Sequence, residues 1–302
     1  MCLLCAAAVA ATAAGAPAPS AAPANFLVAK FVRPVIFSIA GINVYSYGAL
    51  VAAALIVALL VFSQDLQRAK IDLDELSCFF VFLFGFAVGS KAHVAASAFG
   101  AGEPLSWKAL DIRTGHSFMG SQIGAVLCML VYIRCKRVGV LHFLDVLLPC
   151  CLVGHCIGKL GCFFSGDGCY GPPADPERVP WAMSFPNAAV PTIVPVHPTP
   201  LYESACSLIV SLSARYWQPL PAARPGRRTA AILALYGIER MIVEQYRQHP
   251  PIEVFGGLTE YQFLALVLFL IGAAVETWAR RGMAAAAALA AGKPATKTKK
   301  KA

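Results

Sequence analysis

Long apolar segments constrain this chain more than any other feature of its sequence. An α-helix needs roughly 20 mostly apolar residues to cross the hydrocarbon core of a bilayer. The chain has 302 residues, of which 58% are hydrophobic and 14% are charged, whereas about a quarter of the residues of a soluble domain carry charge. We therefore predict an all-α, polytopic membrane protein with about seven transmembrane helices. The expected ranges are 42–62, 76–99, 116–133, 138–157, 199–217, 229–246 and 260–278.

The positions of the basic residues predict how these helices are oriented. The formal net charge of +9 is compatible with nucleic-acid binding, but Arg and Lys gather in every second connection between the expected helices. The positive-inside rule places such connections in the cytoplasm. We therefore predict that the N-terminus lies outside and the C-terminus inside. The basic residues concerned are Arg68, Lys70, Arg134, Lys136, Arg137, Arg215, Arg224, Arg227, Arg228, Arg280 and Arg281.

The two ends of the chain differ in composition from the apolar middle. Residues 1–33 begin with an Ala- and Pro-rich stretch without the basic n-region of a good signal peptide. We expect a disordered or targeting leader there, a transmembrane domain at 34–281, and an Ala- and Lys-rich cytoplasmic tail at 282–302.

The eleven cysteines show no spacing typical of a metal site, and the sequence contains no CxxC motif. Most fall in expected helices, where cysteine behaves as a small apolar residue. Cys162 and Cys169 could form a disulfide if their loop faces an oxidising compartment. We expect neither a metal nor an organic cofactor.

Six polar clusters interrupt the apolar segments, and the predicted orientation places all six in the outer half of the membrane. Charged residues within a span are costly, so they usually face a polar cavity and mark function. The clusters therefore predict one site that is accessible from the outer side. They are Tyr45–Gly48, Lys91 with His93, Gly115–Gly124, Gly158–Pro173, Val196–Ser204 and Tyr236–Gln248.

Two of these clusters have patterns that suit an anionic lipid. Tyr236, Arg240, Glu244 and Arg247 follow one another at steps of four, four and three, so they share one helical face. The segment 158–173 reads GKLGCFFSGDGCYGPP, and its glycines permit an irregular backbone, which membranes tolerate where it lines a cavity. Its amides would suit a lipid phosphate. The alternatives are snorkelling arginines at an ordinary helix end and a well-packed extracytoplasmic turn.

Three segments, GKLGCFFSGDGCYG, VHPTPLYE and YGIERMIVEQYRQ, resemble those of prolipoprotein diacylglyceryl transferases in order and spacing. The likeness runs from about Asn43 to Trp278. It implies a seven-helix enzyme working at the outer leaflet of the plasma membrane, or in an organellar membrane if the host is eukaryotic. Such enzymes transfer the diacylglyceryl group of phosphatidylglycerol to the lipobox cysteine thiol of a prolipoprotein, which forms a thioether and releases glycerol 1-phosphate.

The resemblance also implies the residues of the site. Arg240 matches the family's essential arginine, Glu244 the glutamate that orients it, and Tyr236 a tyrosine that lines the site. Fixed cations of this kind would stabilise the departing phosphate charge. Together with Lys91 of the second cluster, the expected substrate-binding residues are Lys159, Gly158, Gly161, Gly166, Asp167, Tyr47, Tyr202, Glu203 and Arg247.

The chain departs from the family pattern at several positions. Lys159 stands where the signature usually has arginine, so the charge is kept but bidentate phosphate geometry is lost. Cys162 replaces the usual asparagine, although a variant branch carries it too. Met119 occupies the place of a histidine proposed as the base for the thiol, so His116, three residues earlier on a similar face, is a candidate substitute. The alternative is that His116 is an ordinary interfacial histidine. His155 is a second candidate.

Two other functions remain open at this point. A small-solute transporter could use the same scaffold, although we find no internal repeat with paired broken helices, which many transporters have. A degenerate homologue would bind lipid without transferring it, and the residues at positions 119 and 159 favour that alternative.

Overall fold

The computed structural model describes residues 26–39, 41–100, 117–218, 220, 225–247 and 257–291. Its architecture is mostly helical, which confirms the predicted class, and seven long α-helices lie within the described residues. They are α2 (Ser46–Ala69), α3 (Glu75–Gly100), α5 (Phe118–Cys135), α6 (Val140–Ser165), α7 (Thr199–Trp217), α8 (Arg227–Val243) and α9 (Glu260–Ala291). A short 3-10 helix, η1 (Glu244–Tyr246), continues α8.

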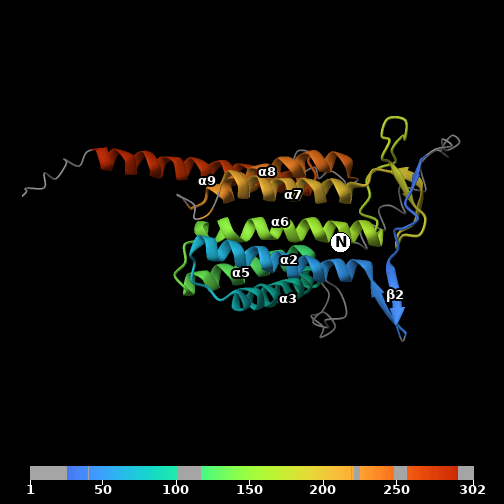
Figure 1. Ribbon diagram of the computed structural model, residues 1–302, viewed down its shortest axis with the longest axis horizontal. Helices are drawn as coiled ribbons and strands as arrows, with labels where there is room; N and C mark the ends of the chain where they lie inside the picture. The colour runs from blue at the N-terminus through green and yellow to red at the C-terminus, as the bar shows by residue number, and fades with distance from the viewer. Residues whose placement is uncertain are drawn as a thin grey trace, which may run out of the picture.

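The helices lie side by side along the long axis of the molecule, and α6 runs through the middle (Figure 1). It packs against α2 on one side and against α7 on the other, while α3 packs on α5 and α8 on α9. Helix α6 ends, α7 begins and α8 ends at the same end of the bundle, where the strands also gather (Figure 1). Three of the predicted polar clusters are therefore brought together.

Four of these helices, α2, α3, α6 and α9, are long and apolar enough to cross a membrane. The apolar part of α5, Gly120–Cys135, is shorter, and within the described residues α7 and α8 do not qualify. These two helices bury charged side chains, such as Glu203 and Arg240, which lowers their hydropathy. The prediction of a helical membrane protein is confirmed, and the prediction of seven spans is supported by composition for four of them.

Five short strands, which the sequence analysis did not predict, form two small sheets. β1 (Leu27–Val28) runs parallel to β4 (Met183–Phe185), which pairs antiparallel with β5 (Thr192–Val196). β2 (Val35–Ile39) and β3 (Ile42–Tyr45) form an antiparallel hairpin. Strands of two to five residues are too short to give a clear alternation of apolar and polar residues.

The boundaries of the folded part differ from those expected. Residues 26–33 belong to the expected leader, yet Ala29 and Val32 are buried against Phe163, Phe185 and Val196. The first part of the expected tail is also ordered, because α9 continues to Ala291. Residues 1–25 and the rest of the tail lie outside the described residues.

A buried ion network holds the end of the bundle opposite the strands. Asp65 Oδ2 lies 2.9 Å from Arg215 and 2.8 Å from Arg228. Arg228 also donates to the carbonyl of Asp145, whose helical partner is missing because Pro149, four residues on, has no N–H. Arg215 and Arg228, which contributed to the predicted membrane orientation, therefore also stabilise the helix packing.

Helices α3 and α5 approach each other closely through small residues. A Cβ on Gly89 would lie 2.7 Å from the Cα of Gly124, and a Cβ on Gly124 would lie 2.6 Å from the Cα of Gly89. Only glycine fits at these positions without a backbone shift, as in other membrane helix pairs.

Candidate functional site

The candidate site is centred on the carboxylate of Glu203, which is 1% exposed. Its Oε2 atom lies 2.6 Å from Lys159 Nζ and 3.2 Å from Arg240 Nη1. The other oxygen, Oε1, accepts a hydrogen bond from Arg247. Because three cations meet on one buried carboxylate, the interaction cannot be an ordinary surface ion pair. We call Lys159, Glu203, Arg240, Glu244 and Arg247 the charged cluster.

Three segments deliver these side chains. Lys159 lies in the penultimate turn of α6, one turn after His155, whose Nε2 atom is 3.8 Å from Glu203 Oε2. Glu203 lies in the first turns of α7, which begins at Thr199 with Pro200 next, a position where proline suits a helix start. Arg240 lies near the end of α8 and Arg247 directly after η1.

Arg240 is held from three sides. It contacts Glu203, and its Nη2 atom donates to Glu244 Oε2 at 3.0 Å. Its guanidinium carbon also lies 5.2 Å from the centre of the Tyr261 ring, within the range of a cation–π interaction. The second oxygen of Glu244 accepts a hydrogen bond of 3.0 Å from Thr259. The guanidinium is therefore fixed in orientation. The predicted helical face is present only in part, because α8 ends at Val243, Glu244 lies in η1 and Arg247 has an extended backbone.

The charged cluster gathers three cations in a small buried space. Lys159, Arg240 and Arg247 meet the carboxylate of Glu203, and Arg240 also meets that of Glu244. Fixed cations gathered in this way stabilise negative charge, so the arrangement suits an anionic ligand such as a phosphodiester.

The expectation for the glycine-rich segment is partly wrong. Helix α6 continues to Ser165, so Gly158 and Gly161 are helical and not irregular. A Cβ on Gly161 would lie 3.4 Å from Tyr47 and Leu50 of α2, whereas no described atom lies within 4 Å of a Cβ on Gly158. The irregular backbone begins at Gly166, whose φ of +63° ends the helix.

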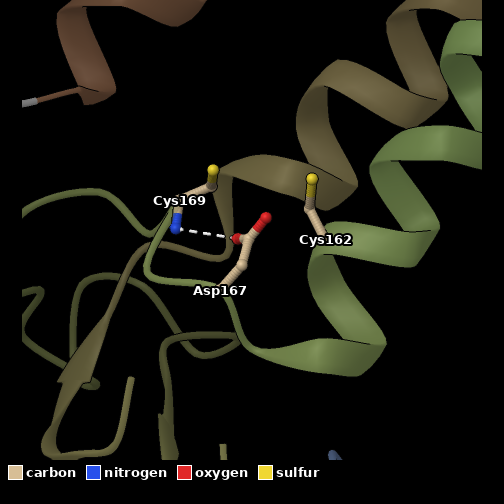
Figure 2. Close-up of side chains that lie close together, drawn as sticks. All are labelled: Cys162, Asp167 and Cys169. Carbon is tan, nitrogen blue, oxygen red and sulfur yellow. Dashed lines mark hydrogen bonds between the residues drawn. The ribbon is translucent and has the colours of Figure 1, made fainter. Parts of the chain in front are cut away.

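Asp167 does not join the charged cluster. It lies in the loop after α6 beside Cys162 and Cys169, and its Oδ1 atom accepts a hydrogen bond of 3.1 Å from the backbone N–H of Cys169 (Figure 2). Burial raises the pKa of the Asp167 carboxyl to about 6.

Other expected residues lie around the charged cluster or away from it. The hydroxyl of Tyr202 accepts from Trp181 Nε1 at 2.5 Å and lies 3.2 Å from His197 Nδ1, so it belongs to an aromatic wall next to Glu203. The ring of Tyr236 meets the His155 ring edge-on, with centroids 6.2 Å apart. Lys91 lies on α3, which packs on α5 away from α7 and α8 (Figure 1). His116 lies outside the described residues.

Sequence reasoning missed three contributors. Thr259 and Tyr261 follow a segment that showed no motif, so nothing in the sequence indicated them. Glu239 is 6% exposed, and neither of its carboxylate oxygens has a hydrogen-bond partner among the described residues. The sequence could have indicated Glu239, because an acidic residue within an apolar helix is costly and usually marks a functional position.

Comparisons with known proteins identify the family of this chain. The sequence model of the family described as prolipoprotein diacylglyceryl transferase matches residues 34–278. The chain is 27% identical over 245 residues to the phosphatidylglycerol–prolipoprotein diacylglyceryl transferase of Clostridium tetani, covering 80% of this chain and 95% of that one. It is 33% identical over 171 residues to the enzyme of the same name from Bordetella parapertussis, which covers 55% and 62%. The corresponding enzyme of Azotobacter vinelandii is 35% identical over 174 residues, covering 56% and 63%. The last two matches thus span slightly less than two thirds of the relatives.

Proposed function

The chain belongs to the prolipoprotein diacylglyceryl transferase family, and from this premise we propose that it is a phosphatidylglycerol–prolipoprotein diacylglyceryl transferase. The diacylglyceryl group of phosphatidylglycerol passes to the lipobox cysteine thiol of a prolipoprotein. A carbon–sulfur bond forms while the carbon–oxygen bond to the phosphate breaks, which leaves a thioether and releases glycerol 1-phosphate. This is the first step of lipoprotein maturation.

The observation that carries the proposal is the meeting of three cations on Glu203. Phosphatidylglycerol has a phosphodiester monoanion in its headgroup, and three cations gathered at one buried position suit such an anion. When the carbon–oxygen bond breaks, the departing phosphate gains a further negative charge. Fixed cations in a water-poor site stabilise that charge more than they stabilise the substrate, which is what lowers the barrier.

Each member of the charged cluster has a part in this scheme. Arg240 is the principal phosphate ligand, since its guanidinium is already oriented by Glu244 and the Tyr261 ring. Lys159 supplies a point charge in place of the family's usual arginine. Glu203 holds the cations close together before the lipid arrives, so little reorganisation is needed during the reaction.

The thiol needs a proton acceptor, and we place it at His155. The imidazole is half-buried, lies one helical turn from Lys159, and has its Nε2 atom 3.8 Å from Glu203. A histidine whose unperturbed pKa is about 6.5 is suited to general-base work near neutrality. Since His116 lies outside the described residues, His155 is the histidine that the described geometry favours.

We further propose that the site faces the outer leaflet of a plasma membrane. The basic residues Arg68–Lys70 and Arg134–Arg137 lie at the ends of α2 and α5, and Arg280–Arg281 lie in the later part of α9, away from the end of the bundle that holds the charged cluster (Figure 1). The positive-inside rule puts those connections in the cytoplasm. If the host is eukaryotic, we expect the protein in an organellar membrane, with the site on the side that corresponds to the outer leaflet.

A mass spectrum tests the transfer. Detergent-solubilised protein is incubated with vesicles containing phosphatidylglycerol and a lipobox peptide, and a Cys-to-Ser peptide serves as the control. We expect a diacylglyceryl-sized mass increase on the cysteine peptide alone, and no increase with Arg240→Ala. Lipid binding without any mass increase would instead support the degenerate homologue, and solute uptake into vesicles would support the transporter.

A further inference from the structure

We propose that Cys162, Asp167 and Cys169 form a binding site for a zinc(II) ion. One sulfur or oxygen donor atom from each of these residues lies within 4.8 Å of the donors of the other two. The three side chains gather where α6 ends, and one carboxylate oxygen of Asp167 points toward the space between the two sulfur atoms (Figure 2). The proposal goes beyond the transferase activity and does not depend on it.

The separations fit a small tetrahedral ion. Zinc binds sulfur at about 2.3 Å and carboxylate oxygen at about 2.0–2.2 Å, so its ligand atoms lie about 3.4–3.8 Å from one another. The three donors, which are at most 4.8 Å apart, need to approach by only about 1 Å. Side-chain rotation in a loop of this kind can supply that movement.

The surrounding backbone already holds the ligands in place. The N–H of Cys169 donates a hydrogen bond of 3.1 Å to Oδ1 of Asp167. This bond orients the other carboxylate oxygen toward the thiols. Thr199, at the start of α7, donates to the carbonyl of Cys169 at 2.5 Å. Hydrogen bonds of this type, which orient the first ligands, are characteristic of built metal sites.

The chemistry of the donors selects the metal. Two thiolates with one carboxylate favour zinc over magnesium or calcium, which prefer oxygen ligands alone. Three protein ligands leave the fourth position of a tetrahedral zinc ion for water. The ligand set carries three negative charges against the two positive charges of the ion, and Lys159, which interacts electrostatically with Cys162, lies one helical turn away.

A disulfide between Cys162 and Cys169 explains the arrangement less well. It would use the two sulfurs alone and leave the half-buried carboxyl of Asp167 beside an apolar S–S bond, with nothing to account for its orientation toward the sulfurs. A metal ion uses all three groups. It also links the end of α6, which carries Lys159, to the loop that Thr199 ties to α7, which carries Glu203. The ion would therefore stabilise the wall of the charged cluster.

The test is the metal content of the full chain. In a parallel sample, thiols are blocked in intact cells before lysis, so that disulfides cannot form during purification. That sample shows whether Cys162 and Cys169 are already joined by a disulfide in the cell. Protein purified from zinc-containing medium is then analysed by inductively coupled plasma mass spectrometry and by cobalt(II) substitution. We expect about one zinc ion per chain and thiolate-to-cobalt charge-transfer absorption.

Variants locate the site. Cys162→Ser and Cys169→Ser should lose the zinc and the charge-transfer band, and Asp167→Asn should weaken zinc affinity, while Cys128→Ser on α5 should keep both. If a variant fails to fold, the zinc content of the unmodified protein still decides. Unmodified protein without zinc, a trapped Cys162–Cys169 disulfide, or equal zinc in all variants would each overturn the proposal. None of these readouts requires transferase activity.

Discussion

Lys159 Nζ lies 2.6 Å from Glu203 Oε2, across the interface between α6 and α7. The contact joins the glycine-rich segment to the HPTPLYE segment, and it places a lysine where the family usually has an arginine. The carboxylate it meets also contacts Arg240 and Arg247. Glu203, which belongs to one of three sequence motifs, therefore contacts residues of the other two and joins all three in one site.

Substitutions of Lys159 test the role of its charge. We expect Lys159→Ala to lower kcat by about 10²–10³-fold, the usual loss when one group that stabilises transition-state charge is removed. Lys159→Arg should keep most of the activity, because arginine is the family's usual residue and retains the positive charge. Initial rates of peptide lipidation on phosphatidylglycerol vesicles measure both. Equal activity of Lys159→Ala and the unmodified protein would remove Lys159 from the phosphate site.

Glu203→Gln should destabilise the fold as well as the site. The substitution keeps the shape of the side chain but leaves three neighbouring cations without their shared counter-ion. Breaking a buried ion pair by neutralising one partner costs about 3–5 kcal/mol. Thermal unfolding in detergent measures the loss, with Glu177→Gln, an exposed loop position, as the matched control. Identical unfolding temperatures for the two variants would contradict the central position of Glu203.

Glu244 should act through Arg240, as a positioning residue. Glu244→Gln loses the charge-assisted hydrogen bond to the guanidinium, so we expect kcat to fall about tenfold with little change in KM. Residues that act as a unit are not additive. The double variant Arg240→Lys/Glu244→Gln should therefore be no less active than Arg240→Lys alone, a background that keeps the positive charge and measurable activity. A further drop in the double variant would show that Glu244 contacts the substrate independently.

The helical periodicity of the chain allowed the proximity of Arg240 and Glu244 to be predicted, because a step of four depends only on local geometry; the extended backbone of Arg247 after η1 was not predicted. The central role of Glu203 and the proximity of His155 depend on how α6, α7 and α8 pack, which a single sequence does not encode in any short pattern. The same holds for Asp65, two of whose three arginine partners lie 150 and 163 residues away. The backbone at Gly158 and Gly161 was misjudged because a glycine inside a helix looks the same in sequence as one that permits a turn, and only Gly166 ends α6.

Asp145 should stabilise the bundle without affecting the chemistry. Its carboxylate accepts hydrogen bonds from the N–H of Gly226 at 2.6 Å and from both the N–H and the hydroxyl of Thr229 at 2.7 Å, so it caps the start of α8 from another helix. Asp145→Ala leaves these buried donors unpaired, and we expect a loss of about 2–4 kcal/mol. The specific activity of the protein that remains folded should stay unchanged. Asp74→Ala, which removes an exposed bond to the Ser77 N–H, should cost only about 1 kcal/mol.

Glu239 offers a contrast with Glu203 that tests the electrostatic account of the site. Both carboxyl groups are buried, at 6% and 1% exposure, but Glu203 contacts three cations, whereas neither oxygen of Glu239 has a hydrogen-bond partner among the described residues. Since a buried polar group without partners contributes no stabilising interaction, Glu239→Gln should leave the unfolding temperature nearly unchanged while Glu203→Gln lowers it. If Glu239→Gln destabilises the protein in nanodiscs but not in detergent, its carboxylate has a partner that only the lipid-bound or membrane-embedded state supplies; destabilisation in both shows a partner within the protein. Unfolding measured in detergent and again in phosphatidylglycerol nanodiscs separates these two cases.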